Sequence, residues 1–251
     1  TLEPIFAQHK PDIIFHAAAY KHVPMLEYYP HQALRVNIGG TRNLLELAER
    51  NQVERFVLIS TDKAVNPTSV MGASKRACEL LLHAAAAEGR GAKYMTAVRF
   101  GNVLGSRGSV VPTFNRQIEN GGPVTITHPD MTRYFMSIPE AVNLIIHAAC
   151  LTESDDIFIL KMGEVVKIVE LAERMIRLRG LRPYQDIPIH FTGIRPGEKM
   201  HEELYYGPEE PKETAHPNMI KLDAWDVNFD ASHFRDRLNE LLANHREFET
   251  T

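Results

Sequence analysis

A hydroxyl, a carboxyl and an amine follow one another at the end of a predicted strand. Thr61, Asp62 and Lys63 follow Ser60 and the apolar run FVLI, which is typical of a buried parallel strand. Open α/β sheets bind their ligands at the carboxyl ends of such strands. Further along, Met71 and Lys75 are four residues apart in a predicted helix, so they share one helical face. The strand end and the helix face together form a candidate site for proton transfer.

The string STDKAVNPTSVMGASKR contains these residues and resembles the short-chain dehydrogenase/reductase superfamily, where a strand-end Ser or Thr precedes a helical Tyr-x-x-x-Lys. Asp62 and Lys63 are similar to the acid/base pair of nucleotide-sugar 4,6-dehydratases. The fuller pattern is similar to the CapD-like polysaccharide-biosynthesis family, whose members act on UDP-N-acetylglucosamine and related sugars. The resemblance extends over nearly the whole chain through PDIIFHAAAYKHVPMLE, NIGGTRNLLELA, RFGNVLGSRGSVVPTF, HPDMTRYFM and RPGEKMHEEL. Met71 departs from it, because most members carry Tyr there.

In a 4,6-dehydration, C4 of the sugar is oxidised, the C5 proton and the C6 hydroxyl leave, and the hydride returns to C6. The resemblance implies that neutral Lys63 is the base at C5 and protonated Asp62 is the acid at C6, with burial reversing their usual ionisation. Thr61 is expected to hydrogen-bond the C4 oxygen, and Lys75 to hold the nicotinamide ribose. Because the thioether of Met71 cannot accept the C4 proton, ionised Asp62 or an ordered water must take it.

Each of these residues also has a purely structural interpretation. An isolated Asp-Lys pair is most often a solvated loop pair worth about 0–1 kcal/mol. Thr61 could cap a turn, and Lys75 could lie on the exposed side of an amphipathic helix. The occurrence of all these residues at this spacing favours the catalytic interpretation.

The predicted strand at 13–19 ends in small residues, which allow a flat ring to approach the backbone. The resemblance implies a bound NAD, in preference to NADP, in contact with His16, Ala17, Ala18, Asn37, Ser60 and Lys75. Tight packing between sheet and helix also uses alanine and is the alternative for this strand end. The glycine fingerprint G-x-G-x-x-G, which brings a pyrophosphate onto a helix amino terminus, does not occur. We therefore expect a fragment that lacks the first βαβ part of the fold.

The chain opens with TLEP, without an initiator Met or a signal peptide. The resembling family often carries amino-terminal membrane spans, and no apolar run of about 18 residues occurs in this sequence. Cys78 and Cys150 are too few for a disulfide framework, and we expect both to be buried core thiols. These features predict a cytoplasmic chain, with association at the inner membrane through a preceding region as an alternative.

Cationic and amide side chains in later loops suit a nucleotide diphosphate, because each arginine can donate two parallel hydrogen bonds to phosphate oxygens. The resemblance implies a UDP-sugar site formed by Lys21, Asn102, Arg107, Arg133, Arg195 and Glu198. For Arg195 the structural alternative is a surface turn with a salt bridge to Glu198. For Arg133 the alternative is that it only fixes its own loop, and the two interpretations stay open.

The composition is that of an ordinary globular protein. The 251 residues are 44% hydrophobic and 24% charged, and the formal charge of −4 argues against nucleic acid as a partner. His16 and His22 lack zinc-like spacing and have no Cys or acidic cluster beside them, so we expect no metal site.

Strands alternating with helices predict βαβ units and a parallel sheet. Strands are expected at 13–19, 56–59, 94–100, 124–127, 157–160 and 187–191, helices at 30–50, 71–88, 110–119, 138–149, 166–179 and 234–248, and a loop at 208–217. The fold class is α/β, a Rossmann-like doubly wound parallel sheet lacking its first βαβ part, with a smaller α+β substrate-binding domain. We place the truncated NAD-binding domain at 1–117, joined by 137–162, and the interleaved substrate-binding domain at 118–251.

The leading hypothesis is a nucleotide-sugar 4,6-dehydratase that uses bound NAD in surface polysaccharide biosynthesis. A C4 or C5 epimerase on the same sugars is the alternative within this class, although a simple C4 epimerase needs no acid at C6. A catalytically silent NAD- or nucleotide-sugar-binding module is the alternative of another class, favoured by Met71 and by the missing glycine fingerprint. The apolar helices at 33–50 and 71–88 also suggest a homo-oligomer, unless they pack within one chain.

Overall fold

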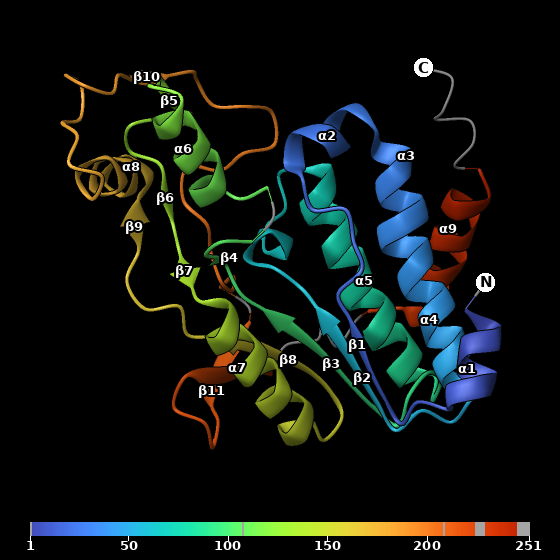
Figure 1. Ribbon diagram of the computed structural model, residues 1–251. Helices are drawn as coiled ribbons and strands as arrows, with labels where there is room; N and C mark the ends of the chain where they lie inside the picture. Colours follow the sequence, from blue (N-terminus) through green and yellow to red (C-terminus); the bar gives the residue numbers. More distant parts are fainter. Residues whose placement is uncertain (1, 107, 208, 224–228, 245–251) are drawn as a thin grey trace.

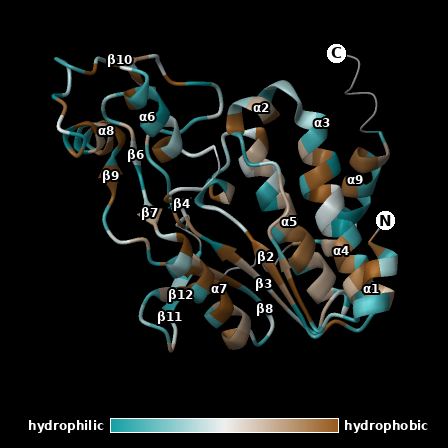
Figure 2. Cartoon of the chain, in the orientation of Figure 1, coloured by the Kyte–Doolittle hydropathy of each residue, from teal (hydrophilic) through white to brown (hydrophobic). Residues whose placement is uncertain are grey.

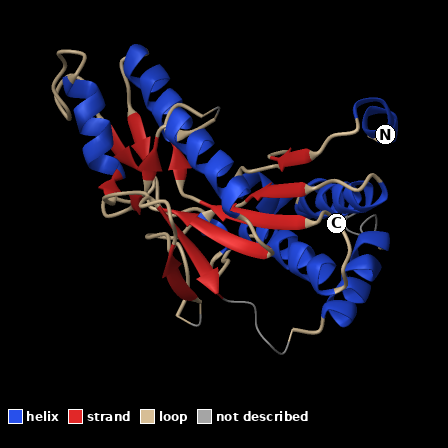
Figure 3. Ribbon diagram, turned by 90° about the horizontal axis from the view of Figure 1, so that it is seen from below, coloured by secondary structure: helices blue, strands red, loops and turns tan. Residues whose placement is uncertain are grey.

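A computed structural model of the chain describes residues 2–106, 108–207, 209–223 and 229–244. Among these residues the central element is a six-stranded sheet with the order β1-β2-β3-β8-β12-β11 (Figures 1 and 3). Its strands are β1 (Ile13–His16), β2 (Arg55–Ile59), β3 (Tyr94–Arg99), β8 (Asp155–Leu160), β12 (Met219–Asp223) and β11 (Glu210–Glu213). The first four are parallel, whereas β12 is antiparallel to both β8 and β11. The predicted α/β fold with a mainly parallel sheet is confirmed.

Helices cover both faces of this sheet (Figure 1). One face carries α4 (Gly39–Arg50) and α5 (Val70–Ala87), with α9 (Ala231–Ala243) packed against α5, and the other face carries α7 (Ile138–Leu151). Helix α9 thus covers part of the surface on which the predicted self-association through α4 and α5 would depend.

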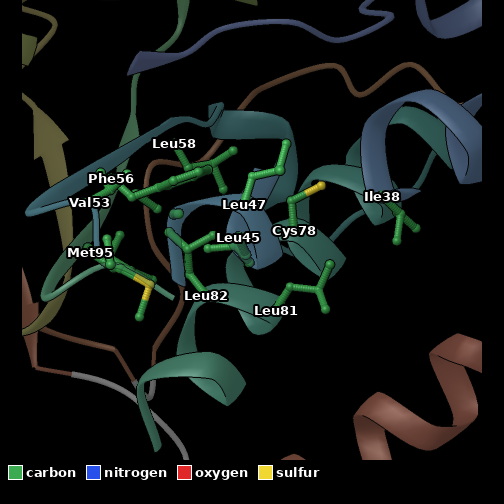
Figure 4. Packing of buried hydrophobic residues seen from close by; sticks show 14 of the residues in the cluster. Ile38, Leu45, Leu47, Val53, Phe56, Leu58, Cys78, Leu81, Leu82 and Met95 are labelled. Atoms are coloured by element: carbon green, nitrogen blue, oxygen red, sulfur yellow. The ribbon is translucent and has the colours of Figure 1, made fainter. Parts of the chain in front are cut away.

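Alternate side chains of the central strands enter two different cores, as the two-residue period of a strand requires. Phe56 and Leu58 of β2 pack toward α4 and α5, whereas Val57 between them packs toward α7. Figure 4 shows the first core, in which Leu45 of α4 and Leu82 of α5 lie beside these strand residues. Because both faces are buried, β2, β3 and β8 are mainly apolar (Figure 2), although β3 also contains the buried Arg99 and β8 begins with two aspartates. Full burial of each such side chain stabilises the fold by about 1.5–3 kcal/mol.

A smaller part of the chain packs around a third core beyond the carboxyl ends of the parallel strands (Figure 1). It contains α6 (Val110–Glu119), α8 (Ile168–Arg177) and three two-stranded pairs. These pairs are β5 (Val124–Ile126) with β10 (Ile189–Phe191), β6 (Thr132–Arg133) with β9 (Val166–Lys167), and β4 (Asn102–Val103) with β7 (Phe135–Met136). This part faces the sheet edge at which the predicted catalytic residues lie.

The amino-terminal segments are helical apart from β1. They are α1 (Glu3–His9), α2 (Val23–Tyr28), α3 (Pro30–Gln32) and the π-helix η1 (Ala33–Ile38), which continues directly into α4. The helix predicted at 30–50 therefore forms, with a wider π-helical turn just before Gly39 and Gly40.

Three expectations for the carboxyl-terminal part differ from the structure. The segment 208–217 was expected to be a loop, but it contains β11, whose residues are all exposed at the sheet edge and so lack the apolar pattern of a buried strand. Strand β12 was not predicted. The last helix, expected at 234–248, spans Ala231–Ala243, and residues 245–248 lie outside the described residues. Residues 210–223 and 231–243, assigned above to the substrate-binding domain, extend the large sheet and pack on α5.

Candidate active site

A cleft of about 470 Å³ opens at the carboxyl ends of β1, β2 and β3, between the large sheet and the smaller part. Its lining includes Ala17 after β1, Ser60 and Thr61 after β2, and Asn102 after β3. The predicted parallel register explains this arrangement, because strands that run in the same direction end at the same edge.

Thr61, Asp62 and Lys63 form a hydrogen-bonded chain at the centre of this edge. The Thr61 hydroxyl donates to Asp62 Oδ1 at 2.8 Å, and Lys63 Nζ donates to the same oxygen at 2.8 Å. Thr61 also accepts from the Lys63 backbone N–H at 3.3 Å, so it caps the short 3-10 helix η2 (Asp62–Ala64), as the structural alternative expected. Asp62 is fully buried, and its second oxygen, Oδ2, has no partner within the described part of the chain. The pair is therefore not a solvated loop pair.

Helix α5 is pressed against η2. Its first turn is capped twice, by the Ser69 hydroxyl, which accepts from Gly72 N at 3.1 Å, and by the Glu27 carboxylate, which accepts from Val70 N at 2.7 Å. A Cβ atom on Gly72 would lie 2.3 Å from the Lys63 carbonyl oxygen, so only glycine permits this approach. The contact fixes the helix face that carries the predicted site residues against the strand end.

Met71 and Lys75 both line the cleft from that face, as their spacing predicts. Met71 is buried and packs with Leu26 and Ala33. Lys75 is only 6% exposed, and burial lowers the pKa of its amine against the raising influence of Cys78 and Glu79. No side chain in the described ranges forms a hydrogen bond or ion pair with this amine. Lys75 therefore presents to the cleft a buried amine that can donate hydrogen bonds and has no partner among the described residues.

A buried ionic cluster lies behind Ser60. The Ser60 hydroxyl donates to Glu79 of α5 at 2.5 Å, and Arg99 of β3 forms forked hydrogen bonds to Glu79 at 2.8–2.9 Å and to Glu209 at 2.7–2.9 Å. Burial alone would raise the pKa of Glu79, but Arg99, Arg76 and the Ser60 hydroxyl together lower it to about 2. The cluster ties the strand end, α5 and the carboxyl-terminal segment together.

The residues predicted to contact the cofactor divide into two groups. Ala17, Ser60 and Lys75 line the cleft, whereas the polar groups of His16 and Asn37 are engaged within the protein. Asn37 bonds the Tyr20 backbone at 2.8 and 3.0 Å and Ser74 at 2.9 Å.

His16 contacts the Thr41 hydroxyl at 2.9 Å, in keeping with hydrogen-bonded packing beside the cofactor strand. Burial, assisted by the charge of Lys75, lowers the His16 pKa to about 4, so the ring is neutral at neutral pH. Ala18 is exposed beside the strand end.

On the predicted substrate side, Lys21, Asn102, Arg195 and Glu198 all line the cleft. Arg195 and Glu198 form a salt bridge at 3.0 Å, and the Arg195 side chain is 57% exposed. Lys21 Nζ lies 3.4 Å from the Ser106 hydroxyl. Arg107 lies outside the described residues. The cationic residues on this side give the cleft a character that suits an anionic ligand.

Arg133 is committed to its own loop more than to the cleft. Its guanidinium donates to the backbone carbonyls of Thr132, Lys199 and Met200 at 2.6–3.2 Å, and the residue is 8% exposed. It lines the cleft but holds the 199–202 segment in place, which favours the structural interpretation left open above.

Several buried charged residues near the site were not predicted from the sequence. Glu202 lies 3.8 Å from Lys63 Nζ and 3.8 Å from Arg133, and Arg99, Glu79 and Glu209 form the ionic cluster. The sequence does indicate a buried ion pair at Arg99, because an arginine inside the mainly apolar run YMTAVRF needs a buried partner. Cys78 is buried as expected, but Cys150 is exposed, because it lies on the outward side of α7, so the expectation of two core thiols was wrong for Cys150.

In the part of the chain that the structure describes, no group of three or more His, Cys, Asp or Glu side chains is placed to hold a metal ion. None of the described helices has the length and apolar character needed to cross a bilayer.

The parallel sheet, the strand-end hydroxyl and the helical lysine define a Rossmann-fold protein of the short-chain dehydrogenase/reductase type. The sequence matches the family described as polysaccharide biosynthesis protein over residues 1–224, and the chain belongs to this family.

Two relatives illustrate its range. Capsular polysaccharide biosynthesis protein CapD of Staphylococcus aureus is 52% identical over 216 residues, which are 86% of this chain and 35% of CapD. UDP-glucose 4-epimerase of Rickettsia canadensis is 39% identical over 226 residues, which are 89% of this chain and 65% of that protein. The chain thus spans about a third of the length of CapD.

Solved structures share the fold. Pen from Bacillus thuringiensis superposes with a TM-score of 0.78 at 35% identity, covering 92% of this chain and 75% of Pen. MoeE5 in complex with UDP-glucose and NAD superposes with a TM-score of 0.63 at 25% identity, covering 74% of this chain and 67% of MoeE5. The expected resemblance to CapD-like proteins and to this superfamily is confirmed.

Proposed function

We propose that the protein is a nucleotide-sugar 4,6-dehydratase acting on UDP-N-acetylglucosamine or a related sugar with bound NAD, in surface polysaccharide biosynthesis. The observation that carries this proposal is the chain Thr61–Asp62–Lys63, in which a hydroxyl and an amine both bond one buried carboxylate oxygen at 2.8 Å beside a cleft. An elimination needs both a base and an acid, and Lys63 and Asp62 supply one of each.

The first proton leaves the C4 hydroxyl. Met71 offers no titratable group, so Thr61 binds the C4 oxygen and passes the proton to Asp62, to which its hydroxyl already donates. The unpartnered Oδ2 of buried Asp62 leaves room for that proton. Of the two acceptors expected from the sequence, ionised Asp62 is therefore the one supported here.

The elimination then uses both members of the pair. Lys63, as a neutral amine, removes the C5 proton, and protonated Asp62 gives its proton to the departing C6 hydroxyl, which leaves as water. Lys63 returns its proton to C5 at the end, so each group recovers its starting form.

Ala17, Ser60 and Lys75, which line the cleft, would hold the nicotinamide end of NAD. The small Ala17 leaves space for a ring at the strand end. The buried Lys75 amine has no partner among the described residues and would suit the ribose hydroxyls. When bound, NAD supplies the acceptor and donor of the hydride exchanged with the sugar. MoeE5, whose fold is shared, is described with UDP-glucose and NAD, which supports both ligands.

The UDP part of the substrate is assigned to the outer cleft. Lys21 and Arg195 line the cleft with their charges only partly engaged, and Asn102 lines the same cleft and offers an amide. Glu198 orients Arg195 through their 3.0 Å salt bridge.

A UDP-sugar 4-epimerase is the second candidate, favoured by the 39% identity to the enzyme of that name from Rickettsia canadensis. The two candidates differ in whether an acid acts at C6. The Asp62–Lys63 pair supports elimination, because simple epimerisation at C4 leaves C5 and C6 untouched.

The test uses the native protein that contains this chain, incubated with NAD and UDP-N-acetylglucosamine. We expect a product lighter by one water, with turnover reduced more than about 100-fold in Asp62→Asn and Lys63→Met. Glu203→Gln, an exposed neighbour of the site, should keep the wild-type rate. Wild-type protein that releases no water, or a Lys63→Met variant as fast as wild type, would reject the proposal.

A further inference from the structure

Glu202 is a buried carboxyl that the proposed reaction leaves unused. It is 7% exposed, and its Oε2 atom has no hydrogen-bond partner within the described part of the chain. Its Oε1 atom lies 3.8 Å from Lys63 Nζ. The proposed function assigns this amine as the base at C5. Burying a carboxyl without hydrogen bonds costs folding free energy, and a functional role would explain why this one is placed there.

The base has a difficulty that this carboxyl can remove. Lys63 lies 2.8 Å from Asp62, a geometry that holds an ammonium and a carboxylate together. An ammonium has no lone pair, so it cannot remove the C5 proton until it has lost one of its own. Asp62 cannot take that proton, because in the proposed sequence it must receive the proton from C4.

We propose that Glu202 is a positioning residue that accepts the proton Lys63 must release before it can act as the base. This inference rests on the proposed function. The transfer breaks one N–H bond of the ammonium and forms one O–H bond on Glu202, so no proton enters or leaves the site. Rotation of the amine between Asp62 and Glu202 changes the partner of a proton without moving the backbone.

The surroundings of Glu202 suit this role. Burial raises the pKa of its carboxyl, which makes it a better proton acceptor. Four charged groups face it: Lys63 and Asp62 of η2, Arg133 of β6, and Lys199 of its own segment. The three cations oppose the rise in pKa and Asp62 adds to it, but burial outweighs the cations. Arg133 at 3.8 Å also keeps Glu202 beside Lys63 by anchoring its segment.

The activity test compares Glu202→Gln with Glu203→Gln in the native protein. Glu203 is the exposed next residue and accepts a hydrogen bond from Asn66 at 3.1 Å, so its variant should match wild type. In Glu202→Gln we expect kcat at pH 7 to fall about 10- to 100-fold with KM unchanged. The deficit should shrink as the pH rises, because hydroxide in the solvent can then take the proton that residue 202 no longer accepts.

Glu202→Met, which also cannot accept a proton, should show the same pH dependence and serves if the glutamine variant does not fold. A wild-type rate in Glu202→Gln, a deficit equal at every pH, or a change in KM alone would overturn the proposal.

A second measurement requires no turnover. Carbon-13 NMR of glutamate carboxyls, assigned by the signal lost in Glu202→Gln, should show Glu202 titrating above the usual range. In Lys63→Met this titration should move higher still, because a cation that lowers the pKa of Glu202 is removed. An ordinary Glu202 titration, or one indifferent to Lys63→Met, would contradict the proposal. If the native protein releases no water from the sugar, the proposed function fails, and the titration alone decides whether Glu202 and Lys63 exchange a proton.

Discussion

Replacing Glu79 with glutamine should lower the free energy of unfolding by about 3 kcal/mol at pH 7. In the folded protein the pKa of Glu79 falls from 4.5 to about 2, because Arg99 and its neighbours overcome the effect of burial. Each pKa unit corresponds to about 1.4 kcal/mol of differential stability, which gives this magnitude. It agrees with the cost of about 3–5 kcal/mol for removing one partner of a buried ion pair.

The dependence on pH has a definite sign. Because the folded-state pKa of Glu79 is depressed, its contribution is complete above pH 4.5 and is lost as the pH falls toward 2. The deficit of the Glu79→Gln variant should therefore shrink over that interval. Arg99 keeps its forked hydrogen bonds to Glu209 at 2.7 and 2.9 Å, so the variant should still fold.

Urea unfolding followed by far-UV circular dichroism at pH 7 and pH 3 measures both effects. The matched control is Glu119→Gln, which breaks an ion pair with Arg179 of similar length, 2.9 Å, but with the Glu119 side chain 63% exposed. This control should lose less than about 1 kcal/mol. A Glu79→Gln deficit as small as that of the control, or one that does not change with pH, would refute the role given to the cluster.

Further outcomes are expected for substitutions at four residues. Gly72→Ala would place a Cβ atom 2.3 Å from a backbone oxygen of η2, so we expect a loss of about 1–3 kcal/mol and at least tenfold slower turnover. Gly40→Ala in α4, with no atom within 4 Å of its Cβ, should instead gain up to about 1 kcal/mol in the same urea assay. Arg195→Ala should raise KM for the UDP-sugar about tenfold or more while leaving unfolding nearly unchanged, and an unaltered KM would remove Arg195 from the substrate site. Because burial and the charge of Lys75 lower the His16 pKa from 6.5 to about 4, His16 should add about 3 kcal/mol above pH 6.5 that is lost as the pH falls to 4. In urea unfolding, the difference in free energy of unfolding between wild type and His16→Gln should narrow as the pH falls from 6.5 to 4. A difference that stays constant would argue against this role of His16.

The arrangement of Thr61, Asp62 and Lys63 and of the helix face could be predicted because local rules determine it. An apolar run marks the end of β2, parallel strands end together, and a four-residue spacing places Met71 and Lys75 on one side of α5. Each of these inferences needs only residues that are close in sequence.

The buried carboxylates that contact Lys63 and Arg99 could not be predicted in the same way. Glu202 reaches Lys63 from a segment without apolar periodicity, and Glu209 reaches Arg99 across 110 residues of sequence. Their burial depends on how distant segments pack, which no short window of sequence records. Strand β11 was missed for a related reason, since an exposed edge strand has no alternation of apolar and polar residues.

The most direct test of the central claim is the fate of deuterium placed at C4 of UDP-N-acetylglucosamine. If Lys63 and Asp62 carry out an elimination, the native protein should give a product that has lost water and bears the deuterium at C6. A sugar of unchanged mass, with the deuterium still at C4 and that centre epimerised, would contradict the account.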